Sequence, residues 1–276
     1  MTGINHGILV GYDGSASSRE AVNWAARAAR ARGVVLTVSH AWEPGHAGPA
    51  LEPEHQDPAE SSARWILSTA VRNPDPDEVR PILAEGSAAR VLCEQSADSE
   101  IVVVGSRGLG GLAGLMLGSV SLQVATLAFS PVVVVRGRWR AMGGYAPGHI
   151  VVGIDGSAAS TDALTFAGTE AALRNVPLTA VCALADSPGE LGAAQHIGED
   201  FERLVTDWEK EHPEVELHRQ ITCRSARTAL LDAAQDAQLL VVGRRGRGGL
   251  PRMLLGTVTE TLLSHTPCPV AVVGAR

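Results

Sequence analysis

The chain of 276 residues contains the same unit twice. Residues 8–15 and 151–157 share the pattern Gly-x-Asp-Gly-Ser after an apolar run, and residues 131–135 and 269–273 repeat a later Pro-Val run. The offset between the copies is 142 early in the unit and 138 later, so four residues are missing from a loop in the middle of the second copy. Internal repetition on this scale predicts two domains of one fold, residues 1–138 and 146–276, joined by a linker over 137–148.

Apolar runs and helical periodicities alternate within each copy. In the first copy, strands are predicted over residues 8–12, 34–40, 79–84, 101–104 and 132–135, and residues 42–58 predict a loop. Helices are predicted between the strands, the first after the turn Asp13-Gly14-Ser15, with Trp24 on its buried face. Strands that are apolar almost throughout are typical of parallel sheets covered on both faces. The predicted fold class is therefore α/β, with two repeated five-stranded parallel sheets and helices on both faces of each.

A glycine pattern follows the fourth strand of each copy. Residues 105–108 read Gly-Ser-Arg-Gly, and nine residues later comes Gly118-Ser119; residues 243–246 read Gly-Arg-Arg-Gly, followed at the same spacing by Gly256-Thr257. Glycine after a strand lets backbone N–H groups approach an anion, and the next helix adds its positive end and a hydroxyl group. The pattern predicts two phosphate sites. Asp13 and Asp155 would lie beside them if strands one and four are neighbours in the sheet.

Two common phosphate loops do not fit this pattern. A Walker A loop requires a lysine beside its last glycine, and the single lysine of the chain, Lys210, lies in neither loop. A Rossmann loop belongs after the first strand of its unit, whereas these loops follow the fourth.

Composition excludes several kinds of partner and site. The net charge of −7 argues against a nucleic-acid partner. No apolar run approaches the roughly 18 residues of a membrane helix, and no signal peptide is visible, so the expected location is cytoplasmic and no membrane partner is expected. The four cysteines form no C-x-x-C pair and the nine histidines show no ligand spacing, so no metal site is predicted.

The glycine pattern together with Asp13 and Asp155 resembles the nucleotide motif of the universal stress protein family. The resemblance covers nearly the whole chain, in the tandem two-domain form with the motif complete in both copies. It implies an adenine-nucleotide α-hydrolase-like fold and ATP as ligand, with Mg²⁺ as an optional companion. It also implies an intramolecular pseudo-dimer through strands 132–135 and 270–273, with a homodimer as a further option.

The resemblance also implies roles for individual residues. The adenosine end of each site would be formed by Gly11, Asp13 and Ala41 in the first domain and by Gly153, Asp155 and Ala183 in the second. Phosphates would be held by Gly105, Gly108, Gly118 and Ser119, and by Gly243, Gly246, Gly256 and Thr257. Arg107 and Arg244, Arg245 and Arg247 would neutralise phosphate charge, or else be solvated.

Several alternatives stay open from the residues alone. Asp13 and Asp155 are also typical helix caps, and Ser121 and Thr259 suit either phosphate binding or capping. The expected function is an ATP-binding regulatory stress-response protein that acts on an unknown protein partner through nucleotide-dependent conformation. The alternatives are a slow ATP hydrolase or phosphotransfer enzyme and a structural dimerisation module. No catalytic residue is predicted, because no base for water and no loop lysine is evident.

Overall fold

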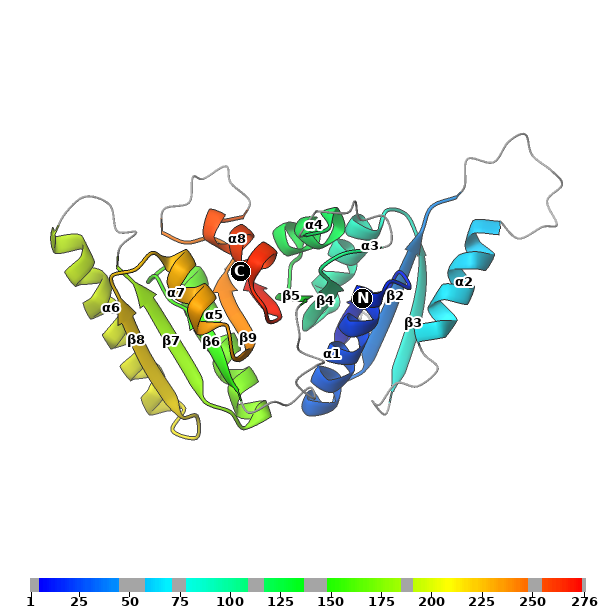
Figure 1. The fold of residues 1–276 in the computed structure, drawn as a ribbon. Coiled ribbons are helices and arrows are strands. Elements are labelled where there is room, and N and C mark those ends of the chain that lie inside the picture. Colours follow the sequence, from blue (N-terminus) through cyan, green and yellow to red (C-terminus); the bar gives the residue numbers. More distant parts are fainter. Residues whose placement is uncertain are drawn as a thin grey trace. The chain divides into compact units, whose positions relative to one another are not determined.

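The chain folds into two units of the same strand–helix order, Met1–Val135 and Arg136–Arg276 (Figure 1). The computed structural model describes residues 5–44, 58–70, 78–108, 117–136, 148–184, 191–247 and 255–274. Most of the loop expected over 42–58 and nearly all of the linker expected over 137–148 lie outside the described residues.

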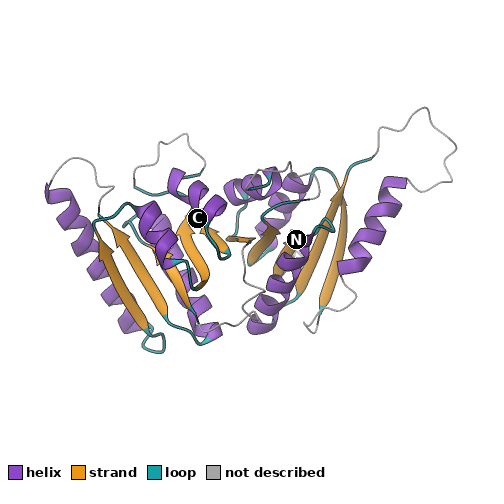
Figure 2. Cartoon of the chain, viewed as in Figure 1, coloured by secondary structure: helices purple, strands orange, loops and turns teal. Residues whose placement is uncertain are grey.

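The described elements alternate between strand and helix in both units (Figure 2). The first unit contains β1 (Ile8–Gly11), α1 (Ala16–Arg32), β2 (Leu36–Trp42), α2 (Pro58–Ala70), β3 (Val79–Glu85), α3 (Ala88–Gln95), the short 3-10 helix η1 (Ser96–Asp98), β4 (Ile101–Gly105), α4 (Ser119–Leu127) and β5 (Val132–Val135). The second contains β6 (His149–Gly153), α5 (Ala158–Arg174), β7 (Leu178–Ala183), α6 (Leu191–Glu211), β8 (Leu217–Thr222), α7 (Ala226–Ala233), β9 (Ala237–Gly243), α8 (Thr257–His265) and β10 (Val270–Val273).

All neighbouring strands within each unit are parallel, which confirms the predicted fold class. The order is β3-β2-β1-β4-β5 in the first unit and β8-β7-β6-β9-β10 in the second. β1 therefore pairs with β4, as the placement of the site requires. The registers also locate the four missing residues. Leu36 and Leu178 begin the second strand of their units, and they pair with Val79 and Leu217 of the third strand. The second unit therefore reaches its third strand four residues sooner, so the missing residues lie between these two strands.

Helices cover both faces of each sheet. In the first unit α1 packs on β1 and β4 and α2 packs on β2 and β3, whereas α3 contacts β1, β2 and α4. Right-handed crossovers require this division, because the chain changes direction across the sheet after β3. The strands are consequently buried on both sides, and Ile8, Leu9, Val10 and Val102 have no exposed surface.

The first helix of each unit shows how local sequence sets its ends. Ser15 is the N-cap of α1 and its hydroxyl oxygen accepts from the Ser18 N–H; Ser157 caps α5 in the same way. Gly33 ends α1 in the left-handed conformation with φ of 65°, which glycine adopts without a Cβ penalty. Trp24 is 3% exposed, which confirms its predicted place in the core.

Element boundaries differ from the sequence prediction at several positions. β2 begins at Leu36 and not at residue 34, because the N–H of Val34 completes the C-cap of α1 by donating to Ala29. β2 then continues to Trp42, whose position pairs with Glu85 of β3. α2 begins at Pro58, the last residue of the loop predicted over 42–58. Among the described residues, no helix is long and apolar enough to cross a membrane.

Two helical glycines make a matched test of the packing between α5 and α6. A Cβ atom on Gly168 of α5 would overlap the indole ring of Trp208, which is buried and stacks on His212. A Cβ atom on Gly198 of α6 would meet nothing within 4 Å. We expect Gly168→Ala to lower the free energy of unfolding by about 1–3 kcal/mol through overpacking. Gly198→Ala should raise it by up to about 1 kcal/mol through helix propensity.

Thermal unfolding of the two variants measures this difference. A change of 1 kcal/mol corresponds to a shift in Tm of about 2–5 °C for a domain of this size. Equal stabilisation by both substitutions would show that Gly168 does not carry the close contact with Trp208.

Candidate functional site

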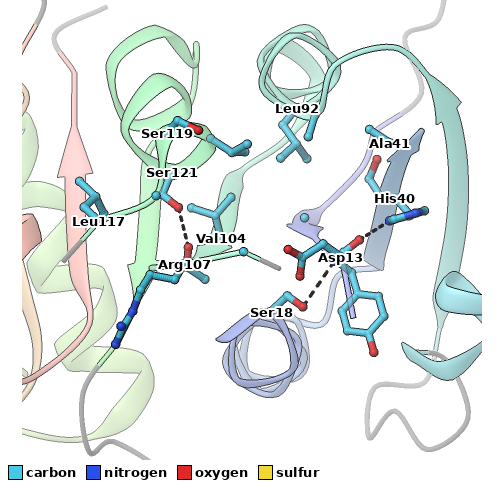
Figure 3. Close-up of a pocket in the computed structure, with 18 residues that line it drawn as sticks. Asp13, Ser18, His40, Ala41, Leu92, Val104, Arg107, Leu117, Ser119 and Ser121 are labelled. Atoms are coloured by element: carbon cyan, nitrogen blue, oxygen red, sulfur yellow. Dashed lines mark hydrogen bonds between the residues drawn. The ribbon is translucent and has the colours of Figure 1, made fainter. Parts of the chain in front are cut away.

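A cavity of about 480 Å³ opens at the carboxyl ends of β1 and β4, the two strands at which the order of the first sheet reverses (Figure 3). Ligands of open α/β sheets bind at this kind of switch point. All eight residues that the sequence assigns to the first site line the cavity: Gly11, Asp13, Ala41, Gly105, Arg107, Gly108, Gly118 and Ser119. The fold therefore brings together residues that are more than 100 positions apart in sequence.

Asp13 lies between the end of β1 and the glycine loop. Its Oδ1 accepts from the N–H of Ser15 at 2.9 Å, and a Cβ on Gly108 would lie 2.6 Å from its Oδ2. The side chain that caps α1 is Ser15, so Asp13 does not occupy the cap position. The carboxylate is thus held against the loop, where its oxygens can accept hydrogen bonds from hydroxyl groups of a ligand.

The glycine loop is fixed to the start of α1. A Cβ on Gly105 would lie 2.6 Å from the carbonyl carbon of Ser17, so only glycine allows the loop and the helix to approach this closely. The Ser17 hydroxyl oxygen accepts from the N–H of Arg107 at 3.3 Å. These contacts show that Gly105 serves packing as well as access to a ligand.

The N-terminus of α4 forms the other wall. Gly118 is its N-cap, and the first N–H bonded back within the helix is that of Leu122, which donates to Gly118. The N–H groups of the first turn therefore have no acceptor within the helix and are suited to an anion. The Ser121 hydroxyl donates to the carbonyl oxygen of Gly105 at 2.6 Å, so this hydroxyl ties the helix to β4.

Arg107 contributes its backbone to the loop more than its charge. Its side chain is exposed and extends away from both Asp13 and Ser119 (Figure 3). In this structure the guanidinium group is therefore solvated, which is the second of the two readings that the sequence leaves open for the loop arginines.

Several other residues line the cavity, although no sequence motif marks them as site residues. Leu92 of α3 covers Gly11, where an added Cβ would lie 2.8 Å from Leu92 Cδ1. Ser39 pairs with Gly11 in the register of β1 and β2, is 3% exposed, and has no hydrogen-bond partner for its hydroxyl within the described part of the chain. His40 Nδ1 donates to the Tyr12 carbonyl oxygen at 2.6 Å. Two signals could have identified residues of this group. Tyr12 directly follows Gly11, the glycine that ends β1, and Ser39 lies opposite that glycine on the next strand.

The second unit repeats the backbone of this site. Gly153, Asp155 and Ala183 stand at or just beyond the ends of β6 and β7, and Gly243 ends β9. Gly256 is the N-cap of α8, with Thr257 as its first residue, and the Thr259 hydroxyl donates to Gly243 at 2.9 Å as Ser121 does to Gly105. Gly246 lies against Asp155 Oδ2, and Arg245 is exposed.

The carboxylate of Asp155 accepts hydrogen bonds from the turn that follows it and from the glycine loop. Ser157 donates to Oδ1 from its N–H at 3.0 Å and from its hydroxyl at 2.6 Å, and the N–H of Arg247 donates to Oδ2 at 2.8 Å. Burial alone would raise the pKa of Asp155, but these hydrogen bonds outweigh burial and hold the pKa below its ordinary value of 3.8. Asp155 is therefore ionised at neutral pH.

No group of three or more His, Cys, Asp or Glu side chains that could hold a metal ion occurs among the described residues. Cys182 and Cys268 are buried, and burial raises the pKa of their thiols to about 11 and about 12. Neither thiol is therefore suited to act as a nucleophile at neutral pH.

Comparison with known proteins shows the family of this chain. A family model described as the universal stress protein family matches residues 5–136 and, a second time, residues 147–274. The chain belongs to the universal stress protein family. A universal stress protein of Mycolicibacterium smegmatis is 34% identical over 293 residues, which cover 98% of each chain. One from Mycobacterium tuberculosis is 35% identical over 285 residues, which cover 96% of each chain.

The fold is shared with a solved universal stress protein. The crystal structure of a universal stress protein from Archaeoglobus fulgidus superposes on this one with a TM-score of 0.74, over 98% of both chains, at 18% sequence identity. The two matches of the family model confirm the tandem form that the repeat predicts.

The hydrogen bonds on Asp155 predict a pH dependence of stability. Because the folded-state pKa lies below 3.8, the stabilisation by the carboxylate is complete well above that pH and is lost as the pH falls through the folded pKa. We expect Asp155→Asn to lower the free energy of unfolding at pH 7 and to reduce its decline between about pH 5 and pH 3. Urea unfolding across this range measures both effects.

Asp162→Asn is the matched control, because Asp162 is an exposed carboxylate on α5. A decline with pH that is as steep in Asp155→Asn as in the parent protein would contradict the role given to these hydrogen bonds.

Proposed function

We propose that this universal stress protein binds ATP and acts as a regulatory stress-response protein, through nucleotide-dependent conformation or partner binding. The observation that carries the proposal is the cavity of about 480 Å³ in which all eight predicted residues of the first unit meet. Its volume lies within the range of about 300–1,000 Å³ that is typical of small-molecule sites.

The residues present fit a nucleotide. Asp13 offers carboxylate oxygens to ribose hydroxyls, and the apolar side chains of Leu92 and Val104 suit the face of a base. The first-turn N–H groups of α4 and the Ser119 hydroxyl suit phosphate oxygens. The unpartnered hydroxyl of Ser39 offers a further polar contact inside the cavity. Any Mg²⁺ would be held chiefly by the phosphates, because Mg²⁺ usually keeps several waters and few protein ligands.

Regulation is favoured over turnover by the positions of the ionisable groups. Apart from the solvated Arg107, the ionisable side chains with acid or base function that line the cavity among the described residues are Asp13, His40 and Tyr12. In Figure 3, Asp13 and His40 lie apart from Ser119 at the start of α4. A base for a water nucleophile must be within hydrogen-bond reach of that water. Slow hydrolysis or phosphotransfer is therefore the weaker alternative.

The assembly, partner and location of the protein concern features outside this site. Pairing of the two units through β5 and β10, a homodimer, an unknown regulatory partner and a cytoplasmic location all stay predictions.

Gly118 and Gly256 offer a direct test of ATP binding. An added Cβ would lie no closer than 3.5 Å to any atom at Gly118 and 3.6 Å at Gly256, and neither residue has a positive φ. A valine at either position therefore fits the fold but projects into the space for phosphate. We expect the double variant Gly118→Val/Gly256→Val to lose ATP binding by at least about tenfold, while Tm in the absence of ligand changes by no more than a few degrees.

Calorimetric titration with ATP measures the binding, and Gly198→Ala is the control outside the site. Protein purified without added nucleotide, heat-denatured and analysed for released ATP and AMP gives an independent readout. A parent protein that releases no nucleotide and shows no thermal shift with ATP would overturn the proposed function. A double variant that binds ATP normally would move the site elsewhere.

A further inference from the structure

In the second unit an arginine side chain closes over the turn that follows β6. Arg247 comes directly after the loop glycine Gly246, and its backbone N–H donates to Asp155 Oδ2 at 2.8 Å. Its guanidinium group lies over Gly156, where an added Cβ would be 2.6 Å from Nη2, and donates from Nη2 to Asp200 of α6 at 3.2 Å. One residue thus connects the glycine loop, the strand-one aspartate and α6.

The first unit lacks the charged side chain that reaches α6 in the second. With the offset of 138 that relates the two loops, the position of Arg247 corresponds to Leu109, which has no charge. The contact is therefore a difference between two copies that share their backbone.

The two sites also differ at the end proposed for the adenine base, where the first two strands of each unit finish. This difference does not depend on Arg247. Gly11 pairs with Ser39 in the first unit, whereas Gly153 pairs with Val181 in the second. With the offset of 142 that relates the early parts of the two units, Tyr12 and His40 correspond to Ile154 and Cys182. Two of the three polar side chains of the first unit are already bonded, the Tyr12 hydroxyl to Thr69 and the His40 ring to the Tyr12 carbonyl oxygen. The difference that remains is the buried Ser39 hydroxyl, which has no partner among the described residues, where the second unit has Val181.

We infer that the two nucleotide sites are unequal: the first fills at the lower ATP concentration, and the Arg247–Asp200 pair restricts entry to the second. The inference rests on the proposed function and deepens it. The guanidinium group covers Gly156, the residue directly after Asp155, so a nucleotide that approaches Asp155 from this side meets the Arg247–Asp200 pair. Inside the second site it meets Val181 where the first site offers the Ser39 hydroxyl, which has no partner within the described part of the chain.

The effect of the ion pair itself is modest. The side chains of Arg247 and Asp200 are 40% and 44% exposed. Exposed pairs change an equilibrium by about two- to fivefold. We therefore expect a change of this size in the rate and affinity of ATP binding when the pair is broken.

The test uses full-length protein in which one of the two sites can no longer bind ATP. Gly118→Val leaves only the second site and Gly256→Val leaves only the first, and ATP affinity is measured for each by calorimetry. In the Gly118→Val background, Arg247→Leu introduces the residue found at the equivalent position of the first unit, and Asp200→Asn removes the partner. The association rate of a fluorescent ATP analogue is then measured by stopped flow.

The two substitutions separate closure from simple electrostatics, because they change the net charge in opposite directions. If the pair restricts entry, both accelerate association by about two- to fivefold, and Asp200→Glu retains the slow rate. If Arg247 only attracts phosphate, Arg247→Leu slows association and Asp200→Asn accelerates it, which overturns the role of the pair. Asp207→Asn, which removes an exposed carboxylate that pairs with Lys210 on the same helix, controls for charge.

The outcomes also distinguish this inference from the proposed function. Equal affinities in the two single-site proteins overturn the inequality but leave ATP binding intact. The absence of ATP binding in the parent protein overturns both.

Discussion

The parallel pairing of β1 with β4 is the constraint on which the rest of the first site depends. It places the turn at Asp13 beside the loop after Gly105, at the carboxyl ends of these two strands. This is the point in the strand order where the neighbouring crossovers lie on opposite faces of the sheet. The close contact of Gly105 with Ser17 then fixes the loop to α1, and the Ser121 hydroxyl fixes α4 to the end of β4. A side chain at Gly105 would force the loop off α1 and separate Asp13 from the start of α4, so the backbone contact comes before any ligand chemistry.

Sequence reasoning could predict this arrangement because it depends on short, repeated patterns. Apolar runs separated by helical periodicities predicted the parallel sheets, and the recurrence of the glycine pattern after the fourth strand predicted residues that line one cavity. The side chains at the base end were harder to find. Ser39 and His40 lie within an ordinary strand, and it is the register opposite Gly11 that places Ser39 at the cavity.

The boundary errors have a similar physical origin. Val34 and Val35 are good strand residues by composition, but Val34 completes the C-cap of α1 and the strand begins two residues later. Hydrogen-bond competition between a helix end and a strand start depends on the exact path of the chain, which residue types do not specify. The connection through Arg247 lay beyond prediction for the same reason, since Asp200 sits 47 residues before it on a different element.

The two copies keep their glycines, their strand-one aspartates and the hydroxyls that tie α4 and α8 to the sheet, and they differ in the side chains that surround these groups. Because the backbone of the loop is the same in both copies, both can offer N–H groups to an anion. The side chains around the loop differ, so the selectivity of each site and the path into it depend on its own copy. The buried hydroxyl of Ser39 has no partner among the described residues, and such a hydroxyl costs free energy, about 1–3 kcal/mol, unless a ligand or a water molecule satisfies it. Val181 at the equivalent position carries no such cost. The first unit therefore gains more from a polar ligand than the second, which supplies the thermodynamic basis for unequal sites on one repeated fold.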